Sequence, residues 1–228
     1  MTPNPRPIPR FIADSTQVGI PHGRFAERLG EEFRTACEAI EDLPEGVEVP
    51  AEIEWFPERA WGGRVWVPAI ASAATPGDAA GDEEADGRPL ELFGYVSYVQ
   101  PEEGDPTDLR GHADFTDVLA EENPDWRIDL NDEVIGRWRG ENGRGGAVTL
   151  VWGRPLVRGA VAATAALEME TVDQEVVSKG RFTLIALDAL EGYGDDIFMQ
   201  VKLWNRRAGE LAAESLYDER PSPDSSVG

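Results

Sequence analysis

Leu90-Glu-Leu-Phe-Gly-Tyr-Val-Ser-Tyr-Val99 is the stretch that decides the fold class of this chain. Apolar and polar positions alternate along it, as they do in a half-buried β-strand. The same period of two runs through residues 47–56 and 64–71, which are also rich in Val, Ile, Trp and Phe. The core is therefore expected to be built mainly from β-sheets.

Further segments of this kind follow toward the C-terminus. They span residues 126–138, 147–152, 157–172, 175–187, 197–204 and 210–217. Their close spacing and their Gly and Pro turns predict an antiparallel β-sandwich or single jelly roll of about eight strands. Residues 205–209 predict the loop of a terminal hairpin, with Gly209 free to take a positive φ.

One long helix is predicted over residues 21–43. Its apolar residues recur every three or four positions and are Phe25, Leu29, Phe33, Cys37 and Ile40. Pro44 and Gly46 end it. A second, short helix is predicted over residues 114–121, stopped by Asn123-Pro124.

The predicted domain organisation is a single β-rich domain, residues 21–220, between two extended ends. Four of the first ten residues are proline, so residues 1–20 predict an extended arm that lies in solvent or along a neighbouring molecule. Residues 76–89 predict a mobile acidic loop, and residues 221–228 predict a flexible polar tail. No apolar segment predicts export or direct insertion into a membrane.

The charge balance is the most unusual feature of the composition. The chain has 44 acidic and 21 basic residues, a formal net charge of -23, and only two lysines. Adaptation to molar salt explains both the acid excess and the lack of lysine, because salt screens the repulsion among carboxylates. An acidic protein from a high-GC mesophile is the alternative. Either origin disfavours nucleic acid as a partner, because phosphate binding needs clustered bases.

Few residues offer catalytic or metal-binding chemistry. His22, His112 and Asp114 are the one set that could form a site of two histidines and a carboxylate, but nothing in the sequence brings His22 near the others. Cys37 is expected to be a small buried hydrophobe. The glycine-rich run 140–146 predicts a hairpin loop and not a phosphate cradle. We therefore predict no catalytic, cofactor-binding or metal-binding residues, and no enzyme.

Two resemblances extend this prediction. Phe115-Thr-Asp-Val-Leu-Ala-Glu-Glu-Asn-Pro124, with Gly194-Asp-Asp-Ile197 and the hairpin reaching Glu214, resembles the hot-dog fold of MaoC-type hydratases. In that family a catalytic histidine follows the Asn-Pro pair, whereas Asp125 and Trp126 follow it here. This resemblance implies a cytosolic protein that binds an acyl or other small apolar ligand without the family's catalytic base.

The second resemblance is one of overall character. An acidic, lysine-poor chain of this length, with about eight strands and extended ends, resembles the small single jelly-roll major capsid proteins of icosahedral, internal-membrane viruses of halophilic archaea. The resemblance implies a virion protein whose partners are copies of itself and other capsid-type subunits. Seven tryptophans, most of them in predicted strands, suit the buried cores and interfaces of such a shell. We therefore expect a non-enzymatic assembly protein, with the cytosolic ligand-binding protein as the alternative.

Overall fold

A computed structural model of the chain describes residues 19–49, 51–76, 87–139, 145–167, 170–187 and 199–216. The predicted arm, apart from its last two residues, lies outside the described residues. So do residues 77–86 of the predicted acidic loop, residues 140–144 of the glycine-rich run and the predicted tail.

The prediction of a mainly β fold is confirmed, with twelve strands in the described residues instead of about eight. The jelly-roll topology stays a prediction. One α-helix, α1 (Gly23–Glu38), precedes the strands, and a single 3-10 turn, η1 (Ala120–Glu122), lies among them. The strands are β1 (Glu54–Trp55), β2 (Arg59–Trp61), β3 (Arg64–Ala74), β4 (Pro89–Val99), β5 (Thr107–Thr116), β6 (Ile128–Arg139), β7 (Gly145–Pro155), β8 (Ala162–Leu167), β9 (Glu170–Val176), β10 (Phe182–Leu187), β11 (Met199–Trp204) and β12 (Glu210–Ser215).

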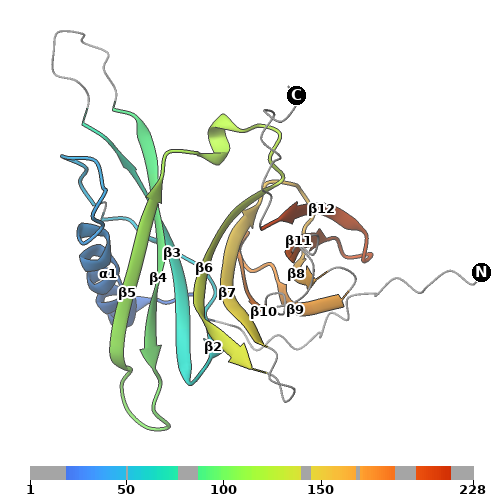
Figure 1. The fold of residues 1–228 in the computed structure, drawn as a ribbon, viewed down its shortest axis with the longest axis horizontal. Helices are drawn as coiled ribbons and strands as arrows, with labels where there is room; N and C mark the ends of the chain where they lie inside the picture. The colour runs from blue at the N-terminus through green and yellow to red at the C-terminus, as the bar shows by residue number, and fades with distance from the viewer. Residues whose placement is uncertain are drawn as a thin grey trace, which may run out of the picture.

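The strands form three antiparallel sheets that stack in layers. Sheet A has the order β1-β3-β4-β5, with β2 also paired to β3; sheet B has the order β10-β7-β6; sheet C has the order β12-β11-β8-β9. Helix α1 covers the outer face of sheet A, sheet B lies against its other face, and sheet C is the layer farthest from the helix (Figure 1). Three apolar cores therefore separate four layers.

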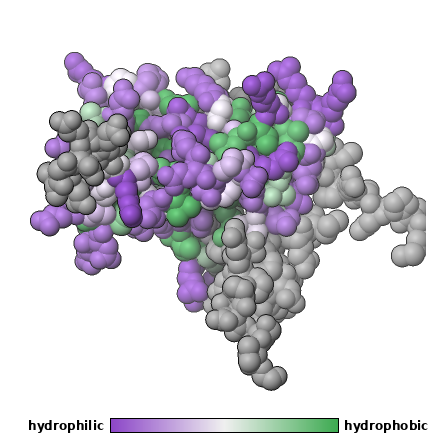
Figure 2. All heavy atoms as spheres, turned by 90° about the horizontal axis from the view of Figure 1, so that it is seen from above, coloured by the Kyte–Doolittle hydropathy of each residue, from purple (hydrophilic) through white to green (hydrophobic). Residues whose placement is uncertain are grey.

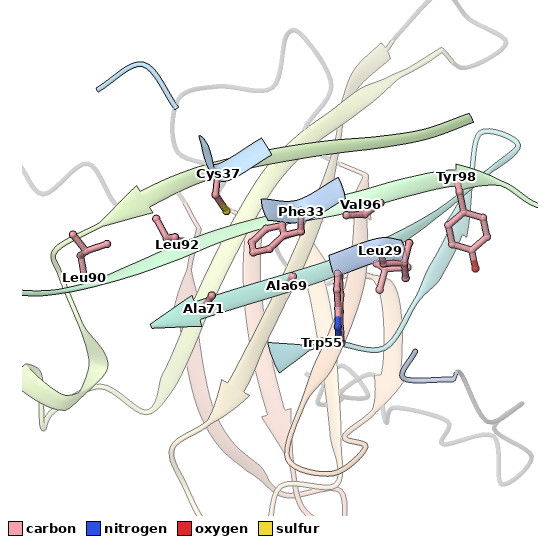
Figure 3. Packing of buried hydrophobic residues seen from close by; sticks show 11 residues of the cluster. Leu29, Phe33, Cys37, Trp55, Ala69, Ala71, Leu90, Leu92, Val96 and Tyr98 are labelled. Atoms are coloured by element: carbon pink, nitrogen blue, oxygen red, sulfur yellow. The ribbon is translucent and has the colours of Figure 1, made fainter. Parts of the chain in front are cut away.

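Strands β3 and β4, in the middle of sheet A, are largely buried on both faces. Ala69 and Ala71 of β3 point toward the helix, where Leu29, Phe33 and Cys37 of α1 cover the sheet (Figure 3). Alternate residues of the same strand, Trp66 and Ile70, point into the second core, which sheet B closes. The alternation in β4 predicts one solvent-facing side, but Phe93 and Tyr95 on that side pack against the second core. The strand is therefore more deeply buried than the half-buried strand that the sequence predicts.

Sheet B is also shared between two cores. Leu150 and Trp152 of β7 face sheet A, whereas Val151 and the β10 residues Phe182 and Leu184 face sheet C. Val201 and Leu203 of β11 meet them from the other side. Most strand pairs join neighbours in the chain, and the pairs β7–β10 and β8–β11 span longer segments.

Helix α1 ends at Glu38, several residues before the predicted end at 43. Its last turn contains no basic residue. Acidic side chains follow at Glu41 and Asp42, which the negative end of the helix dipole disfavours. The N–H groups of Ala39 and Ile40 bond to the carbonyls of Ala36 and Cys37, which closes the last turn.

Gly111 allows α1 to lie close to β5. A Cβ atom at this position would stand 2.8 Å from the backbone oxygen of Glu32 and 2.9 Å from the Cβ of Ala36. Both atoms belong to the helix, so they can move away only if the whole helix shifts.

Replacing Gly111 by alanine is expected to lower the free energy of unfolding by about 2 kcal/mol, because the methyl group overpacks the helix–sheet contact. Urea denaturation measures the change. Gly19→Ala is the control: nothing lies within 4 Å of the added Cβ, so its effect should stay within about 0.5 kcal/mol. Equal effects of the two substitutions would contradict the close approach.

The predicted short helix at 114–121 is wrong. Asp114 to Thr116 are the last residues of β5, which was not predicted as a strand, and only 120–122 form a helical turn. Pairing with β4 and the packing of Phe115 into the first core override the helical spacing. The prediction of one strand over 157–172 is also wrong, because this range contains the whole of β8 and the start of β9, which pair as a hairpin.

The terminal hairpin is confirmed, because β11 pairs with β12 and the N–H of Asn205 bonds to the carbonyl of Gly209. The positive φ, however, belongs to Ala208, at 56°, and not to Gly209. Gly209 is needed for a different reason. A Cβ there would lie 2.8 Å from the Asn205 side chain, whose Oδ1 accepts hydrogen bonds from the N–H groups of Arg207 and Gly209.

Candidate functional site

A cluster of charged side chains lies where sheet A meets sheet B, centred on Arg154 of β7. Its guanidinium bonds to three carboxylates on three other strands: Glu54 of β1 at 3.3 Å, Glu91 of β4 at 2.9 Å and Asp129 of β6 at 2.7 Å. The side chains of Glu91 and Asp129 are 13% and 11% exposed. We call these four residues, together with Arg181, the Arg154 cluster.

Arg181, which directly precedes β10, completes the cluster. Its Nε lies 2.5 Å from Glu54, and its Nη1 donates to the backbone oxygen of Trp55 at 2.8 Å. Its guanidinium also lies 5.9 Å from the centre of the Phe56 ring, within the range of a cation–π contact. Three carboxylates face two guanidiniums, so the cluster has one negative charge in excess.

The excess carboxylate charge shows in the ionisation of the cluster. Burial raises the pKa of Glu91, and the charge of Asp129 raises it further, against the opposing effect of Arg154. Burial likewise raises the pKa of Asp129, with Arg154 again opposing. Desolvation therefore outweighs ion pairing at both carboxylates.

An open groove of about 710 Å³ borders the cluster. Arg154, Arg181, Glu52, Glu54 and Ser72 are among its lining residues. The two guanidiniums already bond to carboxylates and to backbone oxygen, and an arginine cannot give up its proton near neutral pH. The cluster thus joins strands of sheet A to strands of sheet B through ion pairs.

A second ion-pair cluster connects sheets A and C beside β10, an edge strand of sheet B. Arg59 of β2 bonds to Asp173 of β9 at 2.9 Å and also to Glu175 of the same strand. Asp173 accepts a hydrogen bond from the backbone N–H of Ile185 in β10 at 2.7 Å. Burial raises the pKa of Asp173, against the charge of Arg59. One carboxylate thereby joins three strands.

The structure does not gather His22, His112 and Asp114 into a site. His22 precedes α1 and makes no side-chain cap. His112 lies on β5, where its Nε2 is 3.0 Å from Glu133 of β6 and its ring stands against Tyr95. Asp114 accepts from the N–H of Phe115. Among the residues that the structure describes, no group of three His, Cys, Asp or Glu side chains could hold a metal ion.

Two other sequence interpretations can be compared with the structure. Cys37 is fully buried in the core between α1 and sheet A, as expected, and burial raises the pKa of its thiol to about 12. A thiol with so high a pKa is unreactive. Trp55, Trp66 and Trp152 are buried in the cores.

No protein-family model, curated protein or solved structure matches this chain. No helix in the described part of the chain is long and apolar enough to cross a membrane.

Proposed function

We propose that this chain is a non-enzymatic structural protein that assembles with copies of itself in concentrated salt, as the subunits of a virion shell do. One observation carries the proposal. The largely buried carboxylates Glu91, Asp129 and Asp173 each bond to an arginine on another strand. The Glu91–Arg154 pair links sheet A to sheet B, and the Asp173–Arg59 pair links sheet A to sheet C. The ion pairs of these two clusters hold the three sheets of one subunit together.

The filled cores favour this function over the binding of an acyl chain. Phe182, Met199 and Leu203 stand between sheets B and C with at most 1% of their surface exposed. An acyl ligand needs an open apolar cavity. The groove beside the Arg154 cluster has charged residues in its wall, and so does a smaller groove beside α1, which Glu41 and Asp42 line. Neither suits an apolar chain.

Three exposed apolar side chains are available for contacts between subunits. Val118, Val134 and Leu156 are 53%, 56% and 44% exposed. One face of the molecule has hydrophobic groups set among mainly hydrophilic ones (Figure 2). Contacts between apolar groups on so acidic a surface need salt, because each subunit has a net charge of -23 and repels its copies.

The mass of the protein in solution should therefore increase with salt. Multi-angle light scattering is run between ~0.1 M and ~3 M KCl, where the Debye length falls from about 10 Å to below 3 Å. A chain that starts at Phe11 should associate more weakly, because a proline-rich segment loses little conformational entropy when it binds. Circular dichroism confirms that both chains fold.

A full chain that stays monomeric at every salt and protein concentration would overturn the proposed function. Equal association by the full chain and the chain starting at Phe11 would overturn only the role of the arm.

A further inference from the structure

Strand β5 forms one edge of sheet A. It is ten residues long and, in the described residues, pairs with β4 alone. The N–H and C=O groups on the free side of such a strand are a template for a strand from another molecule. A regular edge of this length therefore needs protection.

Side chains occupy the free side of β5 at two positions. The N–H of Gly111 donates to Oε1 of Glu32, on α1, at 3.1 Å. This N–H points away from β4, so the N–H groups two residues along on either side point outward as well. Consistent with this alternation, the N–H of Phe115 donates to Oδ1 of Asp114 at 2.7 Å. Two of the outward donors thus bond to carboxylates.

The beginning of β5 is irregular. The pairing with β4 shifts register between Ser97 and Val99, and Asp108 takes a positive φ of 49°. Arg64 bonds there to the Asp108 carboxylate and to its backbone oxygen, both at 2.6 Å. A bulge and a charged side chain are two of the devices by which natural sheets prevent edge-to-edge pairing.

The middle of the edge is open to approach. A groove of about 360 Å³ runs beside residues 111–114 and the end of α1, with Ala36 and Ile40 in its wall. The glycine at 111 lets the helix come close enough for Glu32 to reach the strand. On the free side of this part of the edge, the two carboxylates bond to the outward N–H groups of β5.

We propose that Glu32 and Asp114 are gatekeepers that keep the β5 edge from pairing with the β5 edge of a second copy of this chain. Two such edges can meet around a twofold axis and extend sheet A into one continuous antiparallel sheet across both copies. The proposal does not rest on the proposed function, because an unprotected edge endangers any soluble β protein.

The test compares two double variants of equal net charge. Glu32→Ala with Asp114→Ala removes both acceptors, whereas Glu32→Gln with Asp114→Asn keeps an amide oxygen at each position. Light scattering at one fixed salt concentration should show at least a doubling of mass for the alanine pair and the parent mass for the amide pair. Hydrogen exchange at residues 109–115 should slow in the alanine pair.

Adding Ala113→Pro to the alanine pair tests whether the β5 edge is the surface through which two copies associate. The N–H of Ala113 points outward, so proline removes no bond to β4 but prevents a new strand from pairing. The mass should return to that of the parent. If the alanine pair, folded by circular dichroism, keeps the mass of the amide pair, the proposal is overturned. Association that survives Ala113→Pro would also overturn it. If the alanine pair does not fold, the mass of the single variant Glu32→Ala, compared by light scattering with that of Glu32→Gln, tests the proposal instead.

Discussion

The midpoint of thermal unfolding is expected to rise by about 10 °C or more between ~0.1 M and ~3 M KCl. The chain has 44 carboxylates and only two lysines, so the folded state is strained by self-repulsion at low salt. Screening that removes about 4 kcal/mol of this repulsion moves the midpoint by roughly 10 °C in a protein of this size.

Differential scanning calorimetry measures the midpoint, and sucrose is the control. Sucrose also stabilises compact states, by exclusion from the protein surface, but it does not screen charge. KCl should therefore raise the midpoint more than sucrose of equal osmolality does. A midpoint that is flat or falls with KCl would remove the case for salt adaptation and leave the high-GC origin as the explanation of the composition.

Replacing Arg154 by alanine is expected to cost about 3 kcal/mol of unfolding free energy at pH 7. The substitution leaves Glu91 and Asp129 largely buried without their shared cation, and an uncompensated buried charge is among the most destabilising changes in a protein. Arg158→Ala is the matched control, because it removes the same charge from an exposed position and should cost less than about 0.5 kcal/mol.

The pH dependence of the Arg154→Ala variant provides a second readout. The folded pKa values of Glu91 and Asp129 already lie above the ordinary 4.5 and 3.8, and losing Arg154 raises them further. Above those ordinary values the folded state binds more protons than the unfolded chain, so stability falls as pH rises through the folded pKa values. The cost of the substitution should therefore shrink from pH 7 toward pH 4.5. If the loss of unfolding free energy is the same at pH 7 and at pH 4.5, the burial of ionised Glu91 and Asp129 is not what destabilises the variant.

The sequence predicts the elements of this fold where one physical signal dominates. Phe25, Leu29 and Phe33 mark the helix because their spacing fits one face, and β4 is evident because apolar residues recur at every second position along it. Strand β5 was not found because its polar residues alternate with Gly111 and Ala113, which give no apolar signal. The sequence does not indicate the boundary between β8 and β9, because residues 162–176 contain no Gly or Pro.

The Arg154 cluster could not be predicted, because its members lie on separate strands up to 127 positions apart, from Glu54 to Arg181. Glu91 stands between Leu90 and Leu92, and Asp129 stands between Ile128 and Leu130. In a sheet with one face in water, both carboxylates would be solvated. Only the stacking of sheet A on sheet B turns those polar positions inward.

The stacking of sheets A and B also sets an order of events during synthesis. All five strands of sheet A and its helix are complete once Thr116 has been made, whereas β7 and β10 lie further along the chain. Until the ribosome has added them, the aromatic face with Phe56 and Trp66 has no cover. A nascent chain in that interval exposes a wide apolar surface, which makes it a substrate for chaperones and a source of aggregation if translation stalls there.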